Sequence, residues 1–326
     1  MDDLKMRISI KTPSRLHLGI IDPTGVSGRV FGSVGVSINQ PNVALETSPH
    51  EKLITSGPRA RRVKILAEKF LKQYGIESGA KIHITEMIPE HVGLGSGTQL
   101  SLAVAMSLAK LFRLKVSINE LAAAMERGSI SGIGTAAFES GGFIIDGGHK
   151  SSEVSTKLKG RGAPPLIFRC PFPEDWRFVV ALPKAKRGLT AEEERLAFHG
   201  LQHPPRESVD MICGLILTKM LPALVEEDIK GFGEALTEVQ ILVGENFSAA
   251  QGGRFSSPVV GKYIDFMLSQ GVYGAGQSSW GPTVYGLINR DKGAEKIRDA
   301  VKDSLGGRVF IASPDNQGAN VEVSEK

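Results

Sequence analysis

Residues 89–99 read PEHVGLGSGTQ, a glycine-rich turn that leads directly into an apolar helical pattern. The N-terminus of a helix exposes unpaired N–H groups and carries about half a positive charge. Glycine lets an anion approach that backbone because it has no Cβ to clash. We therefore expect a cradle for phosphate or diphosphate at this turn. The cradle residues are Gly93, Leu94, Gly95, Ser96, Gly97, Thr98 and Gln99.

The two common phosphate-binding motifs do not match this loop. A Walker A motif is excluded because no Lys-Ser or Lys-Thr pair follows the glycines. A dinucleotide fingerprint needs a third glycine where Thr98 stands, and the preceding strand shows no parallel βαβ pattern. The alternative is a glycine-rich turn that only lets a strand meet a buried helix. Three glycines together with two hydroxyl residues favour the cradle over that alternative.

Length and composition limit the class of protein. The chain has 326 residues, which favours two domains, and we place them at 1–160 and 161–326. No apolar run reaches the roughly 18 residues that span a bilayer, and the charged start is not that of a signal peptide. The net charge of +4 suits anionic small molecules, whereas no basic run with interleaved aromatics indicates nucleic acid. We expect a cytoplasmic protein whose two cysteines form neither a disulfide framework nor a metal site.

Hydrophobic periodicity in the first half predicts several strands and three helices. Pro13 closes the first strand, Asn39–Asn42 form a turn, and Ser117 begins a helix with Glu120 completing a capping box. The predicted strands are 4–10, 15–21, 34–38, 43–47, 81–86 and 141–148, and the other predicted helices are 63–74 and 100–112.

The second half follows a polar boundary at 147–166. A few strands covered on one face by helices form a two-layer α/β sandwich, so the whole chain is predicted to be α+β. The predicted strands are 176–183, 283–288 and 308–312, the last of these ending the fold, and the predicted helices are 206–221, 226–242 and 294–305.

Three segments together resemble the motifs of the GHMP kinase superfamily. They are TPSRLHLG at 12–19, PEHVGLGSGTQ at 89–99 and GAGQSSWGPTVYG at 274–286. The resemblance implies an N-terminal domain like domain 2 of ribosomal protein S5 and a ferredoxin-like C-terminal domain. It also implies that a nucleotide or diphosphate site lies between the two domains.

One departure from the superfamily pattern concerns its chemistry. Many of its kinases carry a catalytic aspartate in a segment similar to SGIGTAAFESGG at 131–142, where this chain has Gly134. A glycine cannot accept a proton from an attacking hydroxyl or orient it. This weakens phosphoryl transfer, although an ATP-dependent small-molecule kinase remains an alternative. A non-catalytic nucleotide sensor is a third hypothesis.

A narrower resemblance accounts for that departure. The segments 12–38, 93–105 and KAKRGLTAEEE at 184–194 are similar to the β-ribofuranosylaminobenzene 5′-phosphate synthases of methanopterin biosynthesis. Enzymes of this branch join phosphoribosyl diphosphate to 4-aminobenzoate, or 4-hydroxybenzoate, and release CO2 and diphosphate. The resemblance implies that the cradle holds the leaving diphosphate, with Mg²⁺, no organic cofactor and a homodimer. It does not identify the metal ligands.

This chemistry selects candidate residues outside the cradle. Phosphate and carboxylate groups need basic or polar ligands, and a cation-like ribose benefits from a nearby carboxylate. Each candidate has a structural alternative: a solvated charge, a buried histidine, a helix-capping glutamate or a tryptophan that anchors the domain interface. The predicted substrate ligands are Arg15, His17, Arg29, Lys184, Arg187, Gln277, Ser278 and Trp280, and the predicted catalytic carboxylates are Asp22 and Glu194.

Overall fold

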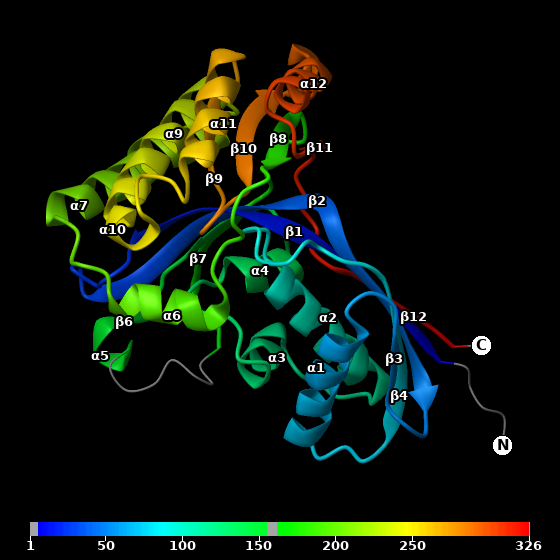
Figure 1. Cartoon of the computed structure of the whole chain (residues 1–326). Coiled ribbons are helices and arrows are strands. Elements are labelled where there is room, and N and C mark those ends of the chain that lie inside the picture. The colour runs from blue at the N-terminus through cyan, green and yellow to red at the C-terminus, as the bar shows by residue number, and fades with distance from the viewer. Residues whose placement is uncertain (1–5, 155–161, 326) are drawn as a thin grey trace.

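The computed structural model describes residues 6–154 and 162–325, and in them the strands form two sheets (Figure 1). In the larger, eight-stranded sheet the order β12-β1-β2-β4-β3 forms the main path, β5 and β6 also pair with β2, and β7 pairs with β5. Its strands are β1 Arg7–Asp22, β2 Arg29–His50, β3 Ile54–Ser56, β4 Gly79–Glu86, β5 Phe143–Asp146, β6 His149–Lys150, β7 Leu166–Cys170 and β12 Asn320–Ser324. The smaller sheet is antiparallel with the order β11-β8-β10-β9, and its strands are β8 Trp176–Leu182, β9 Gly274–Gln277, β10 Val284–Asn289 and β11 Arg308–Ala312.

Helices cover both sheets. A group of four helices lies together on one face of the larger sheet (Figure 1). They are α1 Ala60–Gln73, α2 Ser96–Leu111, α3 Ile118–Ala124 and α4 Ile133–Glu139. The remaining helical segments are α5 Ser151–Val154, α6 Ala191–His199, α7 Arg206–Leu215, η1 Ile216–Met220, α8 Leu221–Val225, α9 Ile229–Asn246, α10 Ser248–Gln251, α11 Pro258–Ser269, η2 Arg290–Lys292 and α12 Ala294–Leu305. The predicted α+β class is confirmed.

Strand β1 is one long strand, so the predicted break between 4–10 and 15–21 is wrong. Pro13 does not end the strand, because the register with β2 shifts between Thr12 and Ser14. Proline has no N–H to donate to a sheet and is tolerated at such a bulge. The bulge therefore keeps the chain extended from the first strand segment to the second.

The turn predicted at Asn39–Asn42 is also wrong, because β2 runs through it. The amide of Asn42 donates to the backbone carbonyl of Thr12 and to that of Asn39, both at 2.8 Å. These side-chain bonds occupy backbone acceptors where the ladder is irregular. The result is a pair of long, continuous strands, β1 and β2.

The other predicted elements are present. α2 is almost entirely buried, as its apolar pattern indicates, and α3 has the predicted capping box between Ser117 and Glu120. In the second half, β8, β10, α7, α9 and α12 correspond to the predicted strands and helices. Alternate residues of β8 face opposite sides: Val179 and Ala181 pack with α11 and α12, whereas Phe178 and Val180 join the main core.

The chain returns to the larger sheet at its C-terminal end. The strand predicted to end the fold, β11, is followed by β12, which pairs antiparallel with β1 from Arg7 to Lys11. β7 also belongs to the larger sheet, although it follows the predicted boundary. The division between 1–160 and 161–326 lies outside the described residues and stays a prediction. The sheets themselves do not separate there, since strands from both halves build the larger one.

An aromatic cluster joins the two sheets. Phe172 is 1% exposed and stacks on Phe143 of β5, with ring centroids 6.4 Å apart. Its ring also contacts Trp176 and Phe178 of β8 at 5.1 and 5.6 Å, and Phe232 of α9 at 5.4 Å. Such pairs add stability beyond the area they bury. The cluster therefore fixes how the two sheets lie relative to each other.

One helical run in the described residues, Arg206–Val225, is long and apolar enough to cross a membrane by length and composition alone. Val209, Ile212, Ile216 and Met220 of this run are buried in the protein. A core helix of a protein in solution meets the same criterion, so the run is weak support for a membrane span.

We predict that Phe172→Ala lowers the free energy of unfolding by about 3–5 kcal/mol, because it removes a large buried ring and leaves a cavity between the sheets. Urea unfolding followed by circular dichroism measures the change. The matched control is Ile167→Ala, since Ile167 is 67% exposed and its loss should change stability by no more than about 0.5 kcal/mol. Equal effects of the two substitutions would contradict this assignment.

Candidate functional site

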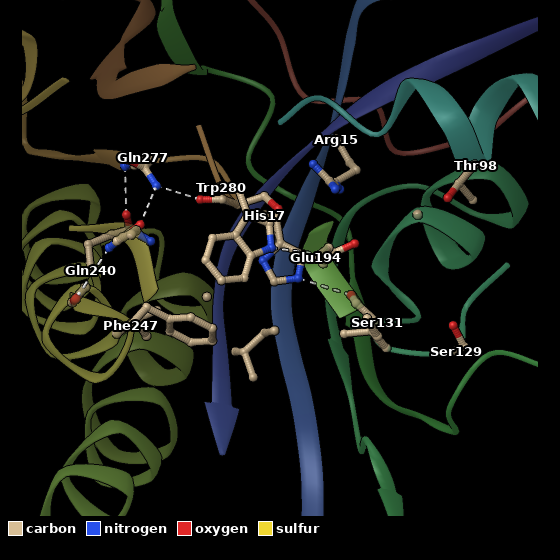
Figure 2. A pocket seen from close by; sticks show the side chains of 18 of the residues that line it. Arg15, His17, Thr98, Ser129, Ser131, Glu194, Gln240, Phe247, Gln277 and Trp280 are labelled. Atoms are coloured by element: carbon tan, nitrogen blue, oxygen red, sulfur yellow. Dashed lines mark hydrogen bonds between the residues drawn. The ribbon is translucent and has the colours of Figure 1, made fainter. Parts of the chain in front are cut away.

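A cavity of about 480 Å³ lies where β1, the start of α2, the 126–131 loop, α6, α9 and β9 meet. In Figure 2, Trp280 and Phe247 lie on one side of it, and Thr98, Ser129 and Ser131 on the other. Arg15, His17 and Glu194 lie between these two sides. The cavity can therefore hold a ligand that is flat and apolar at one end and anionic at the other.

The three glycine-containing motifs meet at the backbone of Gly93. Its carbonyl oxygen accepts hydrogen bonds from the guanidinium of Arg15 and, at 2.6 Å, from the hydroxyl of Ser278. Gly93 has φ of 87°, and a Cβ there would lie 2.2 Å from the carbonyl oxygen of Ser278. No other residue fits this contact without displacing backbone. Part of the glycine content is thus explained by packing between the motifs.

The start of α2 is lined with arginines. Gly95 caps the helix with φ of 82°, and a Cβ there would lie 3.1 Å from the Cγ of Arg15. Guanidinium nitrogens of Arg62 and Arg127 each lie 3.5 Å from the position that a Cβ on Gly97 would take. Both cations therefore flank the first turn, where helix N–H groups already favour an anion.

The other cradle residues have different roles. Thr98 lines the cavity, whereas Gln99 is fully buried and donates from its amide to the carbonyl of Gly134 at 2.8 Å. Gly134 also lines the cavity, and a Cβ there would lie 3.1 Å from Cγ2 of Thr98. A side chain at position 134 would therefore crowd Thr98 and fill this part of the cavity.

Glu194 lies in the first turn of α6 and lines the cavity, while its neighbour Glu193 caps the helix. Thr190 and Glu193 form a reciprocal capping box at the start of α6. The next residue, Glu194, lines the cavity, and its carboxylate accepts a hydrogen bond of 2.9 Å from the indole N–H of Trp280. Of the predicted carboxylates, this is the one that the structure places at the site.

Helix α6 is held over the cavity by aromatic contacts. Phe198 packs edge-on against Phe31, Phe247 and Trp280, with ring centroids 5.1, 5.8 and 5.7 Å apart. Trp280 and Phe247 are themselves 5.2 Å apart in the same edge-on geometry. Trp280 therefore combines the predicted anchoring role with a place in the cavity wall.

Burial controls the charges of the site. Burial lowers the pKa of Arg15 to about 10, although the nearby Glu194 opposes the shift. Burial, together with the charge of Arg15, lowers the pKa of His17 to about 3, so the imidazole is neutral at physiological pH. Burial raises the pKa of Glu194, against the indole hydrogen bond and the charges of Arg15 and Arg127. Both Arg15 and Arg127 thus feel the charge of Glu194, and Glu126, which also lines the cavity, acts on Arg127 as well.

Several residues of the site, Phe247 among them, were not predicted from the sequence. Arg127 lines the cavity and donates to the hydroxyl of Ser101 at 3.0 Å. Ser131 lines it too and bonds the Nε2 of His17 at 3.1 Å, and Asp146 lies behind Ser131. Glycine and serine residues at 128–132 were the available signal for a loop at a site, whereas Asp146 sits in an apolar strand without any signal.

Asp22, the second predicted catalytic carboxylate, holds a turn instead of lining the cavity. Its Oδ1 accepts from the backbone N–H groups of Gly25 and Val26 at 2.7 and 3.1 Å. Its Oδ2 accepts from the N–H and the hydroxyl of Ser27 at 2.9 and 2.7 Å. A carboxylate with these bonds stabilises the loop after β1, which favours Glu194 for chemistry.

Three predicted basic ligands also lie outside the cavity lining. Arg29 is exposed and donates to the carbonyls of Gly147 and Gly148 at 2.6 and 2.8 Å, which ties down the turn after β5. Lys184 and Arg187 are exposed on the segment before α6. Their charges can attract an anion from solution, whereas the described arginines that line the cavity are Arg15, Arg127 and Arg254.

The polar side chains of the third motif hold its loop in place. Gln277 lines the cavity, but its amide oxygen accepts from the N–H of Ser256 and its amide nitrogen donates to the carbonyl of Ser279, both at 2.8 Å. Ser278 is fully buried and accepts from the N–H of His17 at 2.9 Å. Both side chains hold the loop in place, so we expect them to affect a ligand indirectly, through the shape of the loop that it contacts.

Within residues 6–154 and 162–325, no group of three or more His, Cys, Asp or Glu side chains could hold a metal ion. Mg²⁺ is commonly held by one or two carboxylates together with substrate phosphates. Glu194, which is already hydrogen-bonded to Trp280, and Glu126 are the described carboxylates that line the cavity. This donor set fits an ion that arrives with a diphosphate better than a resident one.

Comparison with known proteins agrees with this geometry. The models of the N-terminal and C-terminal domains of GHMP kinases match residues 61–142 and 220–306. The β-ribofuranosylphenol 5′-phosphate synthase of Methanothermobacter thermautotrophicus is 38% identical over 96% of this chain and 98% of its own length. The same-named protein of Archaeoglobus fulgidus is 36% identical over 97% of this chain and 100% of its own.

A solved structure confirms the predicted two-domain fold. The mevalonate kinase of Methanococcus jannaschii superposes with a TM-score of 0.68 at 16% identity, covering 94% of this chain and 98% of its own. At that identity the likeness concerns the fold alone. The resemblance predicted from the three motifs is thereby confirmed, and so is the narrower resemblance to ribofuranosyl-arene 5′-phosphate synthases.

We predict that Glu194→Gln stabilises the protein at about pH 8, and that the gain disappears at about pH 4. A carboxyl whose pKa is raised on folding binds its proton more tightly in the folded state, so its ionisation lowers stability as pH rises. Gln keeps an oxygen for the indole N–H and removes the buried charge. Urea unfolding at the two pH values measures the difference, and a variant less stable than wild type at the higher pH would contradict the assignment.

Proposed function

Because the chain belongs to the GHMP kinase family and, within it, to the β-ribofuranosylphenol 5′-phosphate synthases, we propose that it makes a ribofuranosyl-arene 5′-phosphate. The donor is phosphoribosyl diphosphate, and the acceptor is a benzoate with a para substituent. The products are the coupled arene, CO2 and diphosphate, as an early step of methanopterin biosynthesis. We include a cytoplasmic location and a homodimer in this proposal.

The names of the relatives specify a phenol product. A phenol results when 4-hydroxybenzoate couples at its carboxyl-bearing carbon, whereas 4-aminobenzoate would give an aniline. We therefore take 4-hydroxybenzoate as the acceptor in preference to 4-aminobenzoate.

The observation that carries the proposal is the division of one cavity into an arginine-flanked side and an aromatic side. Arg15 and Arg127 line it near the start of α2, where a diphosphate can also receive helix N–H groups. Phe247 and Trp280 line the other side, where a flat arene fits. The two substrates then meet in the middle, beside His17 and Glu194.

The reaction needs three things from these residues. The arginines and the helix N-terminus stabilise negative charge that grows on diphosphate as the C1–O bond of the ribose breaks. The carboxylate of Glu194 stabilises the cation-like ribose that remains. The arene carbon that bears the carboxylate then attacks C1, and loss of CO2 returns the bonding electrons to the ring. No step transfers a phosphoryl group, so no aspartate is required at Gly134.

We propose that Mg²⁺ enters as the counter-ion of the diphosphate. The carboxylates of Glu194 and Glu126 are the groups available to meet it among the described cavity residues. When bound, the ion neutralises charge on the leaving group.

The second candidate function is an ATP-dependent kinase, which the fold of the solved neighbour allows. Gly134 favours the synthase, because the chain has no carboxylate where many kinases carry a catalytic aspartate, and a Cβ there would lie 3.1 Å from Cγ2 of Thr98. A non-catalytic nucleotide sensor would bind ATP without converting it.

We predict that the purified protein with Mg²⁺, phosphoribosyl diphosphate and carboxyl-labelled 4-hydroxybenzoate releases labelled CO2 and diphosphate in equal amounts. Replacement of 4-hydroxybenzoate by 4-aminobenzoate compares the two acceptors, and chelation of the metal tests the requirement for Mg²⁺. ATP with an alcohol acceptor is the control and should give no ADP. ADP formation without release of CO2 would establish the kinase instead.

We predict that Arg127→Gln raises the KM for phosphoribosyl diphosphate by about 10–100-fold, because a charge-assisted hydrogen bond to phosphate is lost. The KM for the benzoate should stay unchanged, since the arene lies on the other side of the cavity. Arg61→Gln is the matched control, because Arg61 is exposed on α1 one residue before Arg62. Steady-state kinetics measures both constants, and an equal loss in the two variants would refute a direct contact.

A further inference from the structure

A hydrogen-bonded row of three side chains leads from the cavity to a buried carboxylate. The Nε2 of His17 lies 3.1 Å from the hydroxyl oxygen of Ser131, and that hydroxyl lies 3.5 Å from Oδ2 of Asp146. His17 and Ser131 line the cavity, and Figure 2 shows the bond between them. His17 is 5% exposed and Asp146 1%. The three come from β1, the loop before α4 and the end of β5.

Asp146 determines which groups donate and which accept in this row of hydrogen bonds. Its Oδ2 accepts from the N–H of Gly132 at 2.8 Å, and its Oδ1 from the N–H of Gly148 at 3.0 Å. Burial raises the pKa of this carboxyl to about 6, and these hydrogen bonds oppose the shift, so it is mostly ionised at neutral pH. An ionised carboxylate only accepts hydrogen bonds. In the contact between these two side chains, the hydroxyl of Ser131 is therefore the donor, at 3.5 Å from Oδ2.

The tautomer of His17 follows from that direction. Because Ser131 donates its one proton to Asp146, its oxygen can only accept from the ring of His17. The neutral imidazole then carries its proton on Nε2, and Nδ1 is left with a lone pair. The described residues give Nδ1 no hydrogen-bond partner, so it is the ring nitrogen that a ligand in the cavity can use.

We propose that Asp146 is a positioning residue that acts through Ser131 to keep His17 in the Nε2-protonated tautomer, so that Nδ1 accepts a hydrogen bond from a hydroxyl of the phosphoribosyl donor. This inference rests on the proposed function. The ribose fits because its diol offers donors, and because Arg15, two residues before His17 on β1, lies where the diphosphate binds. The wrong tautomer would present an N–H to a hydroxyl that could then only accept from it.

The test replaces Asp146 with a side chain of the same shape. In Asp146→Asn an amide nitrogen in the place of Oδ2 gives up the bond from the N–H of Gly132 and donates to Ser131 instead. The hydroxyl of Ser131 is then free to donate to Nε2, and His17 shifts its proton to Nδ1. Nitrogen-15 NMR of histidine-labelled protein at neutral pH distinguishes the tautomers, and His17→Asn assigns its signal among the seven histidines. We expect the Nε2–H form in wild type and the Nδ1–H form in the variant.

Kinetics gives the second measurement. The KM for phosphoribosyl diphosphate should rise about tenfold in Asp146→Asn, because the ribose hydroxyl must then accept from Nδ1–H and its own proton loses its acceptor, while the KM for the benzoate stays the same. Ser131→Ala keeps the backbone bonds of Asp146 and should give mixed tautomers with a similar KM effect. Asp315→Asn is the control, because Asp315 also holds a turn through backbone N–H groups but is not among the cavity residues.

The outcomes separate this inference from the proposed function. An Nδ1–H signal in wild type, or unchanged spectra in Asp146→Asn and Ser131→Ala, overturns the positioning role while leaving the synthase function in place. Equal rises in both KM values would mean that Asp146 only supports the loop, which also overturns it. A wild-type enzyme that ignores phosphoribosyl diphosphate overturns both the function and the hydroxyl contact.

Discussion

The carbonyl oxygen of Gly93 is the point on which the site depends. It accepts from Arg15 of β1 and from Ser278 of the loop after β9, so three segments far apart in sequence converge on one atom. The absence of a Cβ at position 93 permits this approach, and the arginine that makes the contact also lines the cavity. Arg15 therefore serves both packing and the cavity. Its bond to Gly93 also ties the loop before α2 to β1.

The electrostatics of the cavity follow from this convergence. Arg15 and Arg127 are held in a partly enclosed space near the carboxylate of Glu194, with Glu126 also acting on Arg127, while burial keeps His17 neutral. Cations that are desolvated in this way are unfavourable until an anion arrives, so they are ready to bind one. Glu194, positioned by Trp280, limits that positive charge and provides the only carboxylate that we place beside the ribose.

Local patterns predicted much of this fold, but they failed where distant segments meet. The capping box of α3, the buried α2 and the helix at 294–305 follow from periodicity and capping, and the structure confirms them. Pro13 was a misleading signal because a register shift absorbs it, and β12 could not be predicted because its partner is β1 at the other end of the chain. Among the site residues, Glu194 was predicted from the segment 184–194 that resembles the synthases, and the structure adds that its neighbour Glu193 caps α6. Arg127, Ser131 and Asp146 were not predicted, because only the tertiary fold brings them to β1.

The most direct test of the account is a crystal structure of the protein with phosphoribosyl diphosphate and Mg²⁺. We predict that the diphosphate lies at the first turn of α2, within hydrogen-bond distance of backbone N–H groups near Gly97 and of the Arg127 guanidinium. The ribose C1 should then face the side of the cavity formed by Phe247 and Trp280. A diphosphate bound elsewhere, or a ribose turned away from the aromatic residues, would contradict the central claim.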